Sequence, residues 1–401
     1  MDPSLARRTF LVDPSPTLTL DAEVKALKAQ GKKIINLGVG EPDFETPDFI
    51  REAAIKAIRD GFTRYTPSEG ILSLREAVAQ KFKRDNGLDY SPEDVVITCG
   101  AKHALYNVAQ ALFNPGDEVI VPAPYWVTYP PQIKLAGAIP VYASAKDSAR
   151  HILSPEDLES KITPRTRGLI LNSPSNPTGA VYSKEELSRL AEVLRARPDI
   201  WIISDDIYEK LVYDGQKFHN IAMVAPDLKE RTAICHGVSK TYSMTGWRVG
   251  FLAGPRALAK TVARVQSQMT SNPCSIAQVA GLAALTGPQD RVDEMFRVFE
   301  SRRGLILRLL AKIDGFATTA PEGAFYCFPN VSRVLGATVR GSVVATSDQL
   351  ASLLLKECEV ATIPGAGFGA PQALRFSYAA SAEDIEEGLG RVSALLGAAR
   401  T

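Results

Sequence analysis

The sequence predicts an α/β fold: a large domain with a mostly parallel seven-stranded sheet flanked by helices, and a smaller α+β domain. Seven short apolar runs are bounded by turn residues, as buried strands are. Most of these runs are separated by segments with apolar residues at three-to-four spacing, and this alternation is typical of a parallel sheet. After about Leu282 the alternation gives way to a long helical pattern and shorter segments, which indicates a second domain.

The predicted strands indicate where a ligand should bind. In parallel sheets covered by helices, ligands bind at the carboxyl ends of the strands, where the loops gather. The residues that follow each strand are therefore the candidates for a functional site. The seven predicted strands are Asp94–Thr98, Glu118–Pro122, Ile139–Ala143, Gly168–Asn172, Trp201–Ser204, Thr232–Cys235 and Val249–Ala253.

Capping signals mark the ends of several predicted helices. One apolar helical face ends at Asn86-Gly87, which predicts a left-handed cap. Ser183 with Glu186 has the pattern of a capping box that opens another helix, and Ser381 with Asp384 marks the start of the last one. The buried face of the first helix is Leu74, Ala77, Val78 and Phe82, and that of the second is Leu187, Leu190, Ala191 and Leu194.

The chain is predicted to divide into three segments. Residues 1–44 form an N-terminal arm and part of the small domain, 45–283 the large domain, and 284–401 the small C-terminal domain. The first segment is too short to fold alone. We therefore expect it to pack on the small domain, so that this domain is built from both ends of the chain.

Both ends of the chain carry more detailed predictions. The Ser15-Pro16-Thr17 segment is expected to form an arm or lid before a helix over Asp21–Gly31. The C-terminal part is expected to hold a long helix over Asp290–Lys312 and a strand near Val360–Ile363. Such short mixed elements are typical of an α+β domain.

The composition excludes several classes of function. Lys plus Arg number 46 and Asp plus Glu 45, so the formal charge of +1 gives no field that would attract nucleic acid or an anionic membrane. No apolar run approaches the roughly 20 residues that span a bilayer, and Met1-Asp2-Pro3 does not begin a signal peptide. A cytoplasmic location is expected. Five cysteines without a C-x-x-C pair and four scattered histidines predict neither a disulfide framework nor a metal centre.

Lys240 lies in the most informative segment, which joins two predicted strands. A lysine at the carboxyl end of a strand can be held in a dry pocket, where desolvation and a nearby cation lower its pKa and make the amine nucleophilic. Arg248, eight residues further on, has the planar fork that binds phosphate through two hydrogen bonds. Taken alone, such a pair more often consists of surface cations that flank a turn.

Three further loops follow predicted strands and carry candidate polar groups. Gly100 opens a helix whose backbone N–H groups form an anion site. Asn176 lies in a stiff loop rich in Pro and Asn and can donate through its amide, and Asp205 with Tyr208 places a carboxylate at a strand end. Singly, these residues are also typical of a packing glycine, a surface turn and a helix cap.

Together these segments resemble the fold-type I pyridoxal-phosphate aminotransferases, and specifically the bacterial class I aspartate aminotransferase subgroup. The resemblance covers nearly the whole chain, from about Ser15 to the last helix. No single motif would identify the family, whereas seven in the same order do. They are Gly40–Phe44, Tyr65–Gly70, Pro124–Trp126, Asn176–Gly179, Asp205 with Tyr208, Ser239-Lys240 with Met244–Arg248, and Arg375–Tyr378.

The resemblance implies transamination with pyridoxal 5′-phosphate as the cofactor. Lys240 would form a Schiff base with the cofactor aldehyde and then act as the base that shuttles the 1,3-proton. Asp205 would pair with the protonated pyridine nitrogen, and Tyr208 and Asn176 would hydrogen-bond the phenolate oxygen. The other implied cofactor contacts are Gly100, Ala101, Lys102, Trp126, Ser239, Arg248 and, from the neighbouring subunit of a homodimer, Tyr65.

The resemblance also implies how the substrate is bound. Arg375 would hold the α-carboxylate in a two-point contact. A dicarboxylate needs a second cation, for which Lys102 is the candidate. The expected reaction converts L-aspartate and 2-oxoglutarate to oxaloacetate and L-glutamate by a ping-pong mechanism. The other implied substrate contacts are Gly40, Trp126, Asn176, Ser15 and Thr17.

Prephenate is an alternative substrate. Members of the subgroup that also transaminate prephenate carry an arginine just before the Pro-Ser segment of the arm. This chain has Phe10, Leu11 and Val12 there, although Arg7 and Arg8 lie close in sequence. We therefore favour aspartate over prephenate.

Other functions of proteins with the same fold stay open. An aminotransferase for alanine or aromatic amino acids, or a β- or γ-lyase, would share Lys240, Asp205 and Arg375 and differ mainly in the side-chain pocket. A cofactor-sensing transcriptional regulator would need an upstream helix-turn-helix module. About 14 residues precede the arm, which is too few for such a module.

Overall fold

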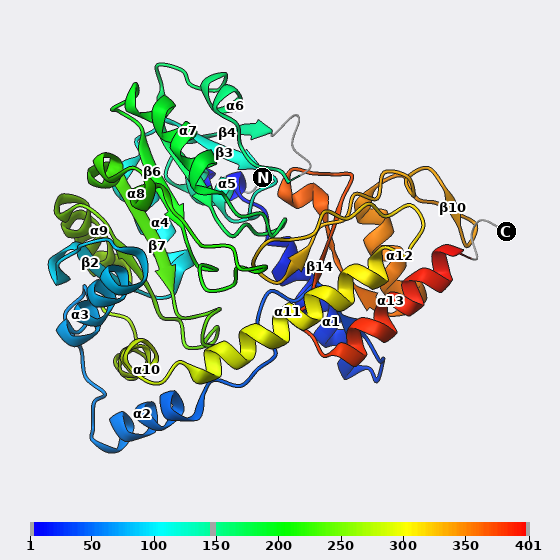
Figure 1. Cartoon of the computed structure of the whole chain (residues 1–401), viewed down its shortest axis with the longest axis horizontal. Coiled ribbons are helices and arrows are strands. Elements are labelled where there is room, and N and C mark those ends of the chain that lie inside the picture. Colours follow the sequence, from blue (N-terminus) through cyan, green and yellow to red (C-terminus); the bar gives the residue numbers. More distant parts are fainter. Residues whose placement is uncertain (1–3, 145–149, 398–401) are drawn as a thin grey trace.

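A seven-stranded sheet forms the centre of the larger part of the molecule (Figure 1). The computed structural model describes residues 4–144 and 150–397. All seven predicted strands are present, with ends within two residues of the prediction. They are β2 (Val95–Thr98), β3 (Glu118–Ala123), β4 (Ile139–Ser144), β5 (Thr166–Asn172), β6 (Trp201–Asp205), β7 (Thr232–Gly237) and β8 (Gly250–Ala253).

The sheet has the order β2-β8-β7-β6-β5-β3-β4 and is mostly parallel, as predicted. β8 is the exception, because it runs antiparallel to both β2 and β7. A parallel return needs a crossover connection, usually a helix. Residues 238–249, which join β7 to β8, contain no helix, so the chain reverses direction instead. This reversal places Lys240 and Arg248 on one loop at the carboxyl end of β7.

Helices cover both faces of the sheet. Along β2, Val95 and Ile97 pack in one core, whereas Val96 between them packs in another on the opposite face. The larger helices of this part, here called the sheet body, are α2 (Asp48–Arg59), α3 (Leu72–Lys81), α4 (Ala101–Leu112), α5 (Tyr129–Leu135), α7 (Lys184–Arg195), α9 (Arg256–Met269) and α10 (Ser275–Thr286). Shorter ones are α6 (Pro155–Glu159) and α8 (Ile221–Val224).

The remaining elements form a smaller body beside the sheet body (Figure 1). Two strands from opposite ends of the chain, β1 and β12, pair in parallel in this body. The elements are β1 (Ile35–Asn36), α11 (Asp290–Leu310), β9 (Tyr326–Cys327), β10 (Thr338–Val339), β11 (Ser342–Val343), α12 (Ser347–Cys358), β12 (Val360–Ala361), β13 (Ile363–Pro364), β14 (Leu374–Ser377) and α13 (Ala382–Gly397).

The predicted strand over Val360–Ile363 is two strands with different partners. β12 pairs with β1, whereas β13 pairs antiparallel with β14. Thr362 separates them and donates its hydroxyl to the Arg375 carbonyl at 2.7 Å. The chain therefore passes from one small sheet to the next at this residue.

The prediction for the N-terminal arm was wrong in its boundary. Helix α1 covers Pro16–Ala29, so Ser15 is its N-cap residue and Thr17 lies in its first turn. Proline at the first helical position has a preset φ and loses no hydrogen bond, which explains the early start. The predicted arm before a helix over Asp21–Gly31 is thus the beginning of that helix.

The predicted helix ends are confirmed. Gly87 has a φ of 66° and ends the helical run of α3 in a left-handed cap. Ser183 and Glu186 form both hydrogen bonds of a capping box, and the Ser381 hydroxyl accepts from the Asp384 backbone N–H at 3.0 Å. Local polar side chains therefore set these boundaries.

Neither a membrane-spanning helix nor a metal-binding cluster is found in residues 4–144 and 150–397. No helix there is long and apolar enough to cross a bilayer. In the same residues, no group of three or more His, Cys, Asp or Glu side chains could hold a metal ion.

Candidate active site

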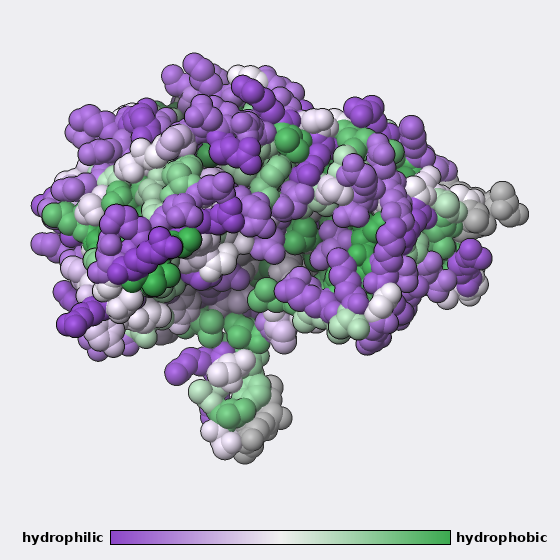
Figure 2. All heavy atoms as spheres, turned by 90° about the horizontal axis from the view of Figure 1, so that it is seen from below, coloured by the Kyte–Doolittle hydropathy of each residue, from purple (hydrophilic) through white to green (hydrophobic). Residues whose placement is uncertain are grey.

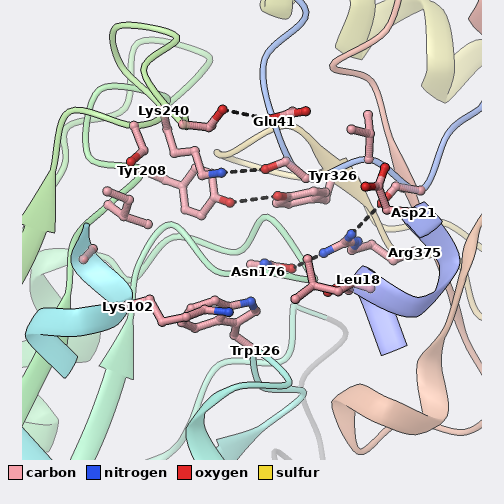
Figure 3. Close-up of a pocket in the computed structure, with 18 of the residues that line it drawn as sticks. Leu18, Asp21, Glu41, Lys102, Trp126, Asn176, Tyr208, Lys240, Tyr326 and Arg375 are labelled. Atoms are coloured by element: carbon pink, nitrogen blue, oxygen red, sulfur yellow. Dashed lines mark hydrogen bonds between the residues drawn. The ribbon is translucent and has the colours of Figure 1, made fainter. Parts of the chain in front are cut away.

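A cavity of about 550 Å³ lies where the carboxyl ends of β5, β6 and β7 face α1, the segment after β1, and strands β9 and β14 (Figure 3). Polar residues from both bodies meet there, as expected for a site at the carboxyl ends of parallel strands. Twelve predicted site residues line it: Thr17, Gly40, Ala101, Lys102, Trp126, Asn176, Asp205, Tyr208, Ser239, Lys240, Arg248 and Arg375.

Three predicted site residues do not line this cavity. The Ser15 hydroxyl lies 3.0 Å from the Thr17 hydroxyl in the first turn of α1. Gly100 is the N-cap residue of α4, directly before Ala101. Tyr65 is 91% exposed, so its side chain points away from its own chain.

Lys240 is buried at the end of the loop after β7, with its amine directed into the cavity (Figure 3). The Nζ atom donates to the Gly40 carbonyl at 2.5 Å. Burial lowers its pKa to about 8, and the cations Arg375 and Arg248 add to this, against the opposite effect of Glu41 and Asp205. Roughly a tenth of the amine is therefore neutral, and nucleophilic, at pH 7, far more than for an ordinary lysine.

Asp205 ends β6 and presents a buried carboxylate to the cavity. Its Oδ2 accepts from the Tyr129 hydroxyl at 2.7 Å, and its backbone carbonyl accepts from Asn172 at 3.0 Å. Burial raises the pKa of this carboxyl to about 6, although the Tyr129 hydrogen bond and Lys240 favour the ionised form. Such a carboxylate is suited to pairing with a cationic group bound in the cavity.

Arg375 is a buried cation without a charged partner. It is 1% exposed, and its guanidinium donates to the Asn176 side-chain oxygen at 2.9 Å and to the Gly38 carbonyl at 2.8 Å. Its Nε atom has no hydrogen-bond partner, and no carboxylate in the described part of the chain forms an ion pair with it. An unpaired buried guanidinium facing a cavity is a strong candidate for binding a carboxylate.

The N-terminus of α4 and Arg248 form a second anion-binding region. Gly100 has a φ of 83°, and a Cβ there would lie 2.4 Å from an Arg248 side-chain nitrogen. Gly250 is also constrained, since a Cβ there would lie 2.2 Å from the Ala101 backbone nitrogen. Gly100 lets Arg248 lie against the start of α4, and Gly250 lets β8 approach the backbone of the same helix start. This arrangement is suited to a phosphate.

Lys102 and Trp126 line the same side of the cavity (Figure 3). The Lys102 ammonium lies 5.0 Å from the centre of the Trp126 ring. Burial, and next the charge of Arg248, lower the pKa of Lys102. The cavity thus contains a cation that is separate from Arg375 and flanked by a flat aromatic surface.

Sequence reasoning missed three polar residues of the site. Tyr129 binds Asp205, Asn172 holds the Asp205 and Asn176 backbones, and Tyr326 lies 2.8 Å from the Tyr208 hydroxyl. Asn172 begins the loop that carries Asn176, so its position at a strand end was a usable signal. The two tyrosines lie in apolar or aromatic runs that read as core, and only the fold brings them to the cavity.

Comparison with known proteins agrees with this geometry. A family model described as aminotransferase class I and II matches residues 32–392. An aspartate aminotransferase from Geobacillus stearothermophilus is 49% identical over 388 residues, covering 97% of this chain and 98% of the relative. A probable aspartate/prephenate aminotransferase from Rickettsia bellii is 50% identical over 387 residues, covering 96% and 97%.

Solved structures give the same result. The aspartate aminotransferase from Rhizobium meliloti superposes with a TM-score of 0.94 at 43% identity, covering 98% of this chain and 99% of the other. That from Thermus thermophilus with maleate has a TM-score of 0.92 at 40% identity, covering 98% and 100%. The chain therefore belongs to the class I and II aminotransferase family and is an aminotransferase of its aspartate aminotransferase subgroup.

Proposed function

We propose that this enzyme transfers the amino group of L-aspartate to 2-oxoglutarate, forming oxaloacetate and L-glutamate, with pyridoxal 5′-phosphate as its cofactor. One observation carries the proposal: the Lys240 amine, whose pKa is lowered to about 8, shares a cavity with the unpaired buried guanidinium of Arg375. The amine suits coupling to an aldehyde, and the guanidinium suits the substrate α-carboxylate. The aspartate aminotransferases among the relatives support this choice of substrate.

The residues present fit this cofactor. The buried carboxylate of Asp205 suits a protonated pyridine nitrogen, and the α4 N-terminus with Gly100, Ala101 and Arg248 suits a phosphate. When bound, pyridoxal phosphate supplies an aldehyde that couples to amines and a ring that takes up electrons from the substrate α-carbon. Ser239 is buried beside the same region and is proposed as a further phosphate contact, and Trp126 as the surface on which the ring stacks.

Lys240 is proposed to be the base of the reaction. With the cofactor bound, the Lys240 Nζ would take the proton from the substrate α-carbon and hold it for its return. A pKa of about 8 suits both tasks near neutral pH. Asp205 would hold the protonated pyridine nitrogen of the cofactor, and Tyr208 would donate its hydroxyl to the cofactor's phenolic oxygen. Asn176 can share that role, since its Oδ1 holds Arg375 and its Nδ2 is left to donate.

The substrate is proposed to lie between two cations. Arg375 binds the α-carboxylate, with Asn176 and the Gly40 backbone beside it. Lys102 binds the distal carboxylate, because it is the cation on the Trp126 side of the cavity. Thr17 lines the cavity and Ser15 is hydrogen-bonded to it, so these hydroxyls are placed to assist.

We further propose a homodimer in which Tyr65 reaches the phosphate of the partner's site. Tyr65 is 91% exposed and follows a series of apolar side chains that are also exposed. Helix α2 lies at the lower edge of the molecule in Figure 1, and Figure 2, seen from below, shows apolar groups among hydrophilic ones on this face. The apolar residues are Ile55 (37% exposed), Ile58 (54%) and Phe62 (39%).

The domain division is proposed as residues 1–44 and 284–401 for the small domain and 45–283 for the large one. The pairing of β1 with β12 and the shared core of the small body support it. Residue 283 falls inside α10, which packs against α2 and α3, so the structural break lies just after this helix. Arg375 from one domain and Lys240 from the other meet in the cavity, so substrate binding can draw the domains together and exclude water.

A cytoplasmic location is proposed as well. All five cysteines are free, which suits a reducing compartment. Cell fractionation followed by activity measurement tests this location.

A second candidate activity is transamination of prephenate. The name of the Rickettsia bellii relative favours it. The sequence before the Pro-Ser segment disfavours this activity, because positions 10–12 are Phe10, Leu11 and Val12 and none of them is an arginine. Turnover of prephenate with aspartate as donor, compared with turnover of 2-oxoglutarate, decides between the two.

Half-reactions test the proposed function. The bound-cofactor absorbance should change with aspartate and glutamate much faster than with alanine or phenylalanine. Faster reaction of alanine or phenylalanine would contradict the aspartate assignment. Lys240→Ala should abolish turnover while the protein stays folded, and substantial residual turnover would contradict the role of the lysine.

A further inference from the structure

Tyr326 contacts two of the proposed functional groups at once. It lies on β9, is 1% exposed, and lines the cavity (Figure 3). Neither the cofactor roles nor the substrate roles described above use this residue. Its position therefore needs a separate explanation.

The hydroxyl of Tyr326 faces the sheet body. It lies 2.8 Å from the Tyr208 hydroxyl. Burial raises the pKa of both phenols, so each keeps its proton near neutral pH. A Cβ on Gly40 would lie 3.4 Å from the same Tyr326 oxygen, and the Gly40 carbonyl accepts from Lys240. The Tyr326 hydroxyl thus lies beside the Tyr208 hydroxyl and beside Gly40, the residue that accepts the hydrogen bond of Lys240.

The ring of Tyr326 faces Arg375. The guanidinium lies 4.4 Å from the Tyr326 ring centre and 5.2 Å from that of Phe368. Tyr326 pairs across the sheet with Ser377, two residues from Arg375, so the two side chains are diagonal neighbours on one face. The ring therefore restricts the plane in which the guanidinium can present its donors to a carboxylate.

The geometry points to Tyr326 as a positioning residue that holds the Tyr208 hydroxyl with its own hydroxyl and the Arg375 guanidinium with its ring. Tyr326 thereby links Tyr208, the proposed donor to the cofactor's phenolic oxygen, to Arg375, the proposed contact of the substrate carboxylate. This inference rests on the proposed function, because Tyr208 and Arg375 have these roles only there.

The direction of the effect follows from hydrogen-bond geometry. Each phenol has one proton, so when Tyr208 donates to the cofactor oxygen it must accept from Tyr326. A hydroxyl that accepts a hydrogen bond becomes a stronger donor. Loss of the Tyr326 hydroxyl should therefore weaken the Tyr208 donor and favour protonation of the bound chromophore. The pH midpoint of its absorbance change should rise.

The test separates the hydroxyl from the ring in the holoenzyme. Tyr326→Phe should raise the absorbance midpoint by roughly 0.3–0.5 pH units and lower kcat about threefold to tenfold. Its KM for aspartate and its Kd for succinate, a dicarboxylate without an amino group, should stay within about twofold of wild type. Tyr326→Leu should in addition raise the Kd for succinate about fivefold to thirtyfold, as expected from loss of a desolvated cation–π contact.

Tyr213→Phe is the matched control. Tyr213 is fully buried in the same core, and its hydroxyl donates to the Ala324 carbonyl at 2.5 Å, but it does not line the cavity. This variant should match wild type in the absorbance midpoint, kcat, KM for aspartate and Kd for succinate. An unchanged midpoint and kcat in Tyr326→Phe, or an unchanged succinate Kd in Tyr326→Leu, would overturn the inference.

The outcome is distinguishable from failure of the proposed function. If wild type does not convert aspartate, the proposed function fails, whereas succinate binding still reports on the Tyr326–Arg375 contact. If wild type converts aspartate and the Tyr326 variants match it, only the inference fails. Should Tyr326→Leu unfold, Tyr326→Met removes the same ring and supports the same comparison.

Discussion

Lys102 lies in the first turn of α4 and lines the cavity, and this position makes a residue-scale prediction. If it binds the distal carboxylate, Lys102→Ala should lower kcat/KM for aspartate about tenfold to hundredfold, as expected for loss of a charge-assisted hydrogen bond. The value for alanine, which has no distal carboxylate, should change no more than about threefold. Steady-state kinetics with both substrates provide the measurement.

Lys25 is the matched control for this prediction. It also lines the cavity, but its ammonium already pairs with Asp21 at 2.7 Å. Lys25→Ala should change kcat/KM for aspartate and kcat/KM for alanine by the same factor. Equal losses for the two substrates in Lys102→Ala would instead assign Lys102 to the phosphate or the fold.

Asp205 makes the cofactor-free protein sensitive to pH. Its pKa is about 6 in the folded protein and about 3.9 in an unfolded chain. The folded state therefore binds more protons between these values, and its stability falls as pH rises through this window. Asp205→Asn removes this loss, so the variant should be more stable than wild type at pH 8, by up to roughly 2–3 kcal/mol, but not at pH 3.5. Urea unfolding at both pH values tests this, and a difference independent of pH would refute it.

The position of a residue in the cavity could be predicted from sequence where a motif couples residue type to a strand end. Lys240, Asp205 and Asn176 all follow predicted strands, and all three reach the cavity. Tyr129 and Tyr326 could not be found in this way, because their contacts depend on packing between segments far apart in sequence. Tyr326 meets Tyr208 across 118 residues, and its aromatic neighbourhood gives the same pattern as any core strand.

At the scale of elements, a buried ion pair fixes the loop behind the site. Lys81 at the end of α3 pairs with Glu209, which follows Tyr208, and both side chains are almost fully buried. Asn86 links the two by accepting from Lys81 at 2.8 Å and donating to Glu209 at 3.2 Å. Helix α3 is thus connected to the loop that carries Asp205 and Tyr208.

Breaking this pair should be costly. Lys81→Met removes the nearest cation from the buried Glu209 carboxylate, whose other neighbours are Lys210 at 4.0 Å and His236 at 3.4 Å. It should lower the free energy of unfolding by about 3–5 kcal/mol. The double variant Lys81→Met/Glu209→Leu should recover at least half of that loss, because no unpaired charge remains. Urea denaturation measures the free energy of unfolding of the single and the double variant. Lys56→Met, which removes an exposed pair with Asp60, should have little effect; a comparable loss there would argue against burial as the cause.

Element boundaries were predictable where local chemistry sets them. Ser183, Ser381 and Gly87 cap helices through their own side chain or backbone, and these ends were predicted correctly. The antiparallel β8 and the division between β12 and β13 depend on partner strands, which a single segment does not encode. The start of α1 was missed because Ser15-Pro16-Thr17 suits both a turn and a helix N-terminus.

At the scale of the whole molecule, α11 belongs to both bodies. Its first turn packs Val292 against a core of the sheet body, whereas Phe299 and Ile306 lie in the core of the small body. With 21 residues it is about 31 Å long. A continuous helix of this kind should make the two cores unfold together.

A proline in this helix tests that coupling. Ser301→Pro, at an exposed position inside α11, removes a backbone hydrogen bond and should cost about 3 kcal/mol or more. Thermal unfolding is expected to be a single transition for wild type and should separate into two transitions for this variant. Asp290→Pro is the control, because it occupies the first helical position, where proline is tolerated. A single transition in Ser301→Pro would show that α11 does not couple the cores.

The pairing of β1 with β12 has a consequence for synthesis on the ribosome. Ile35 and Leu37 leave the ribosome early, but their core partners include Val360, Leu389 and others near the C-terminus. At 5–20 residues per second, those partners appear roughly 15–70 s later. The sheet body, complete by Thr286, can fold during this interval. The small body cannot close before translation is nearly finished, so the cavity between them is assembled last.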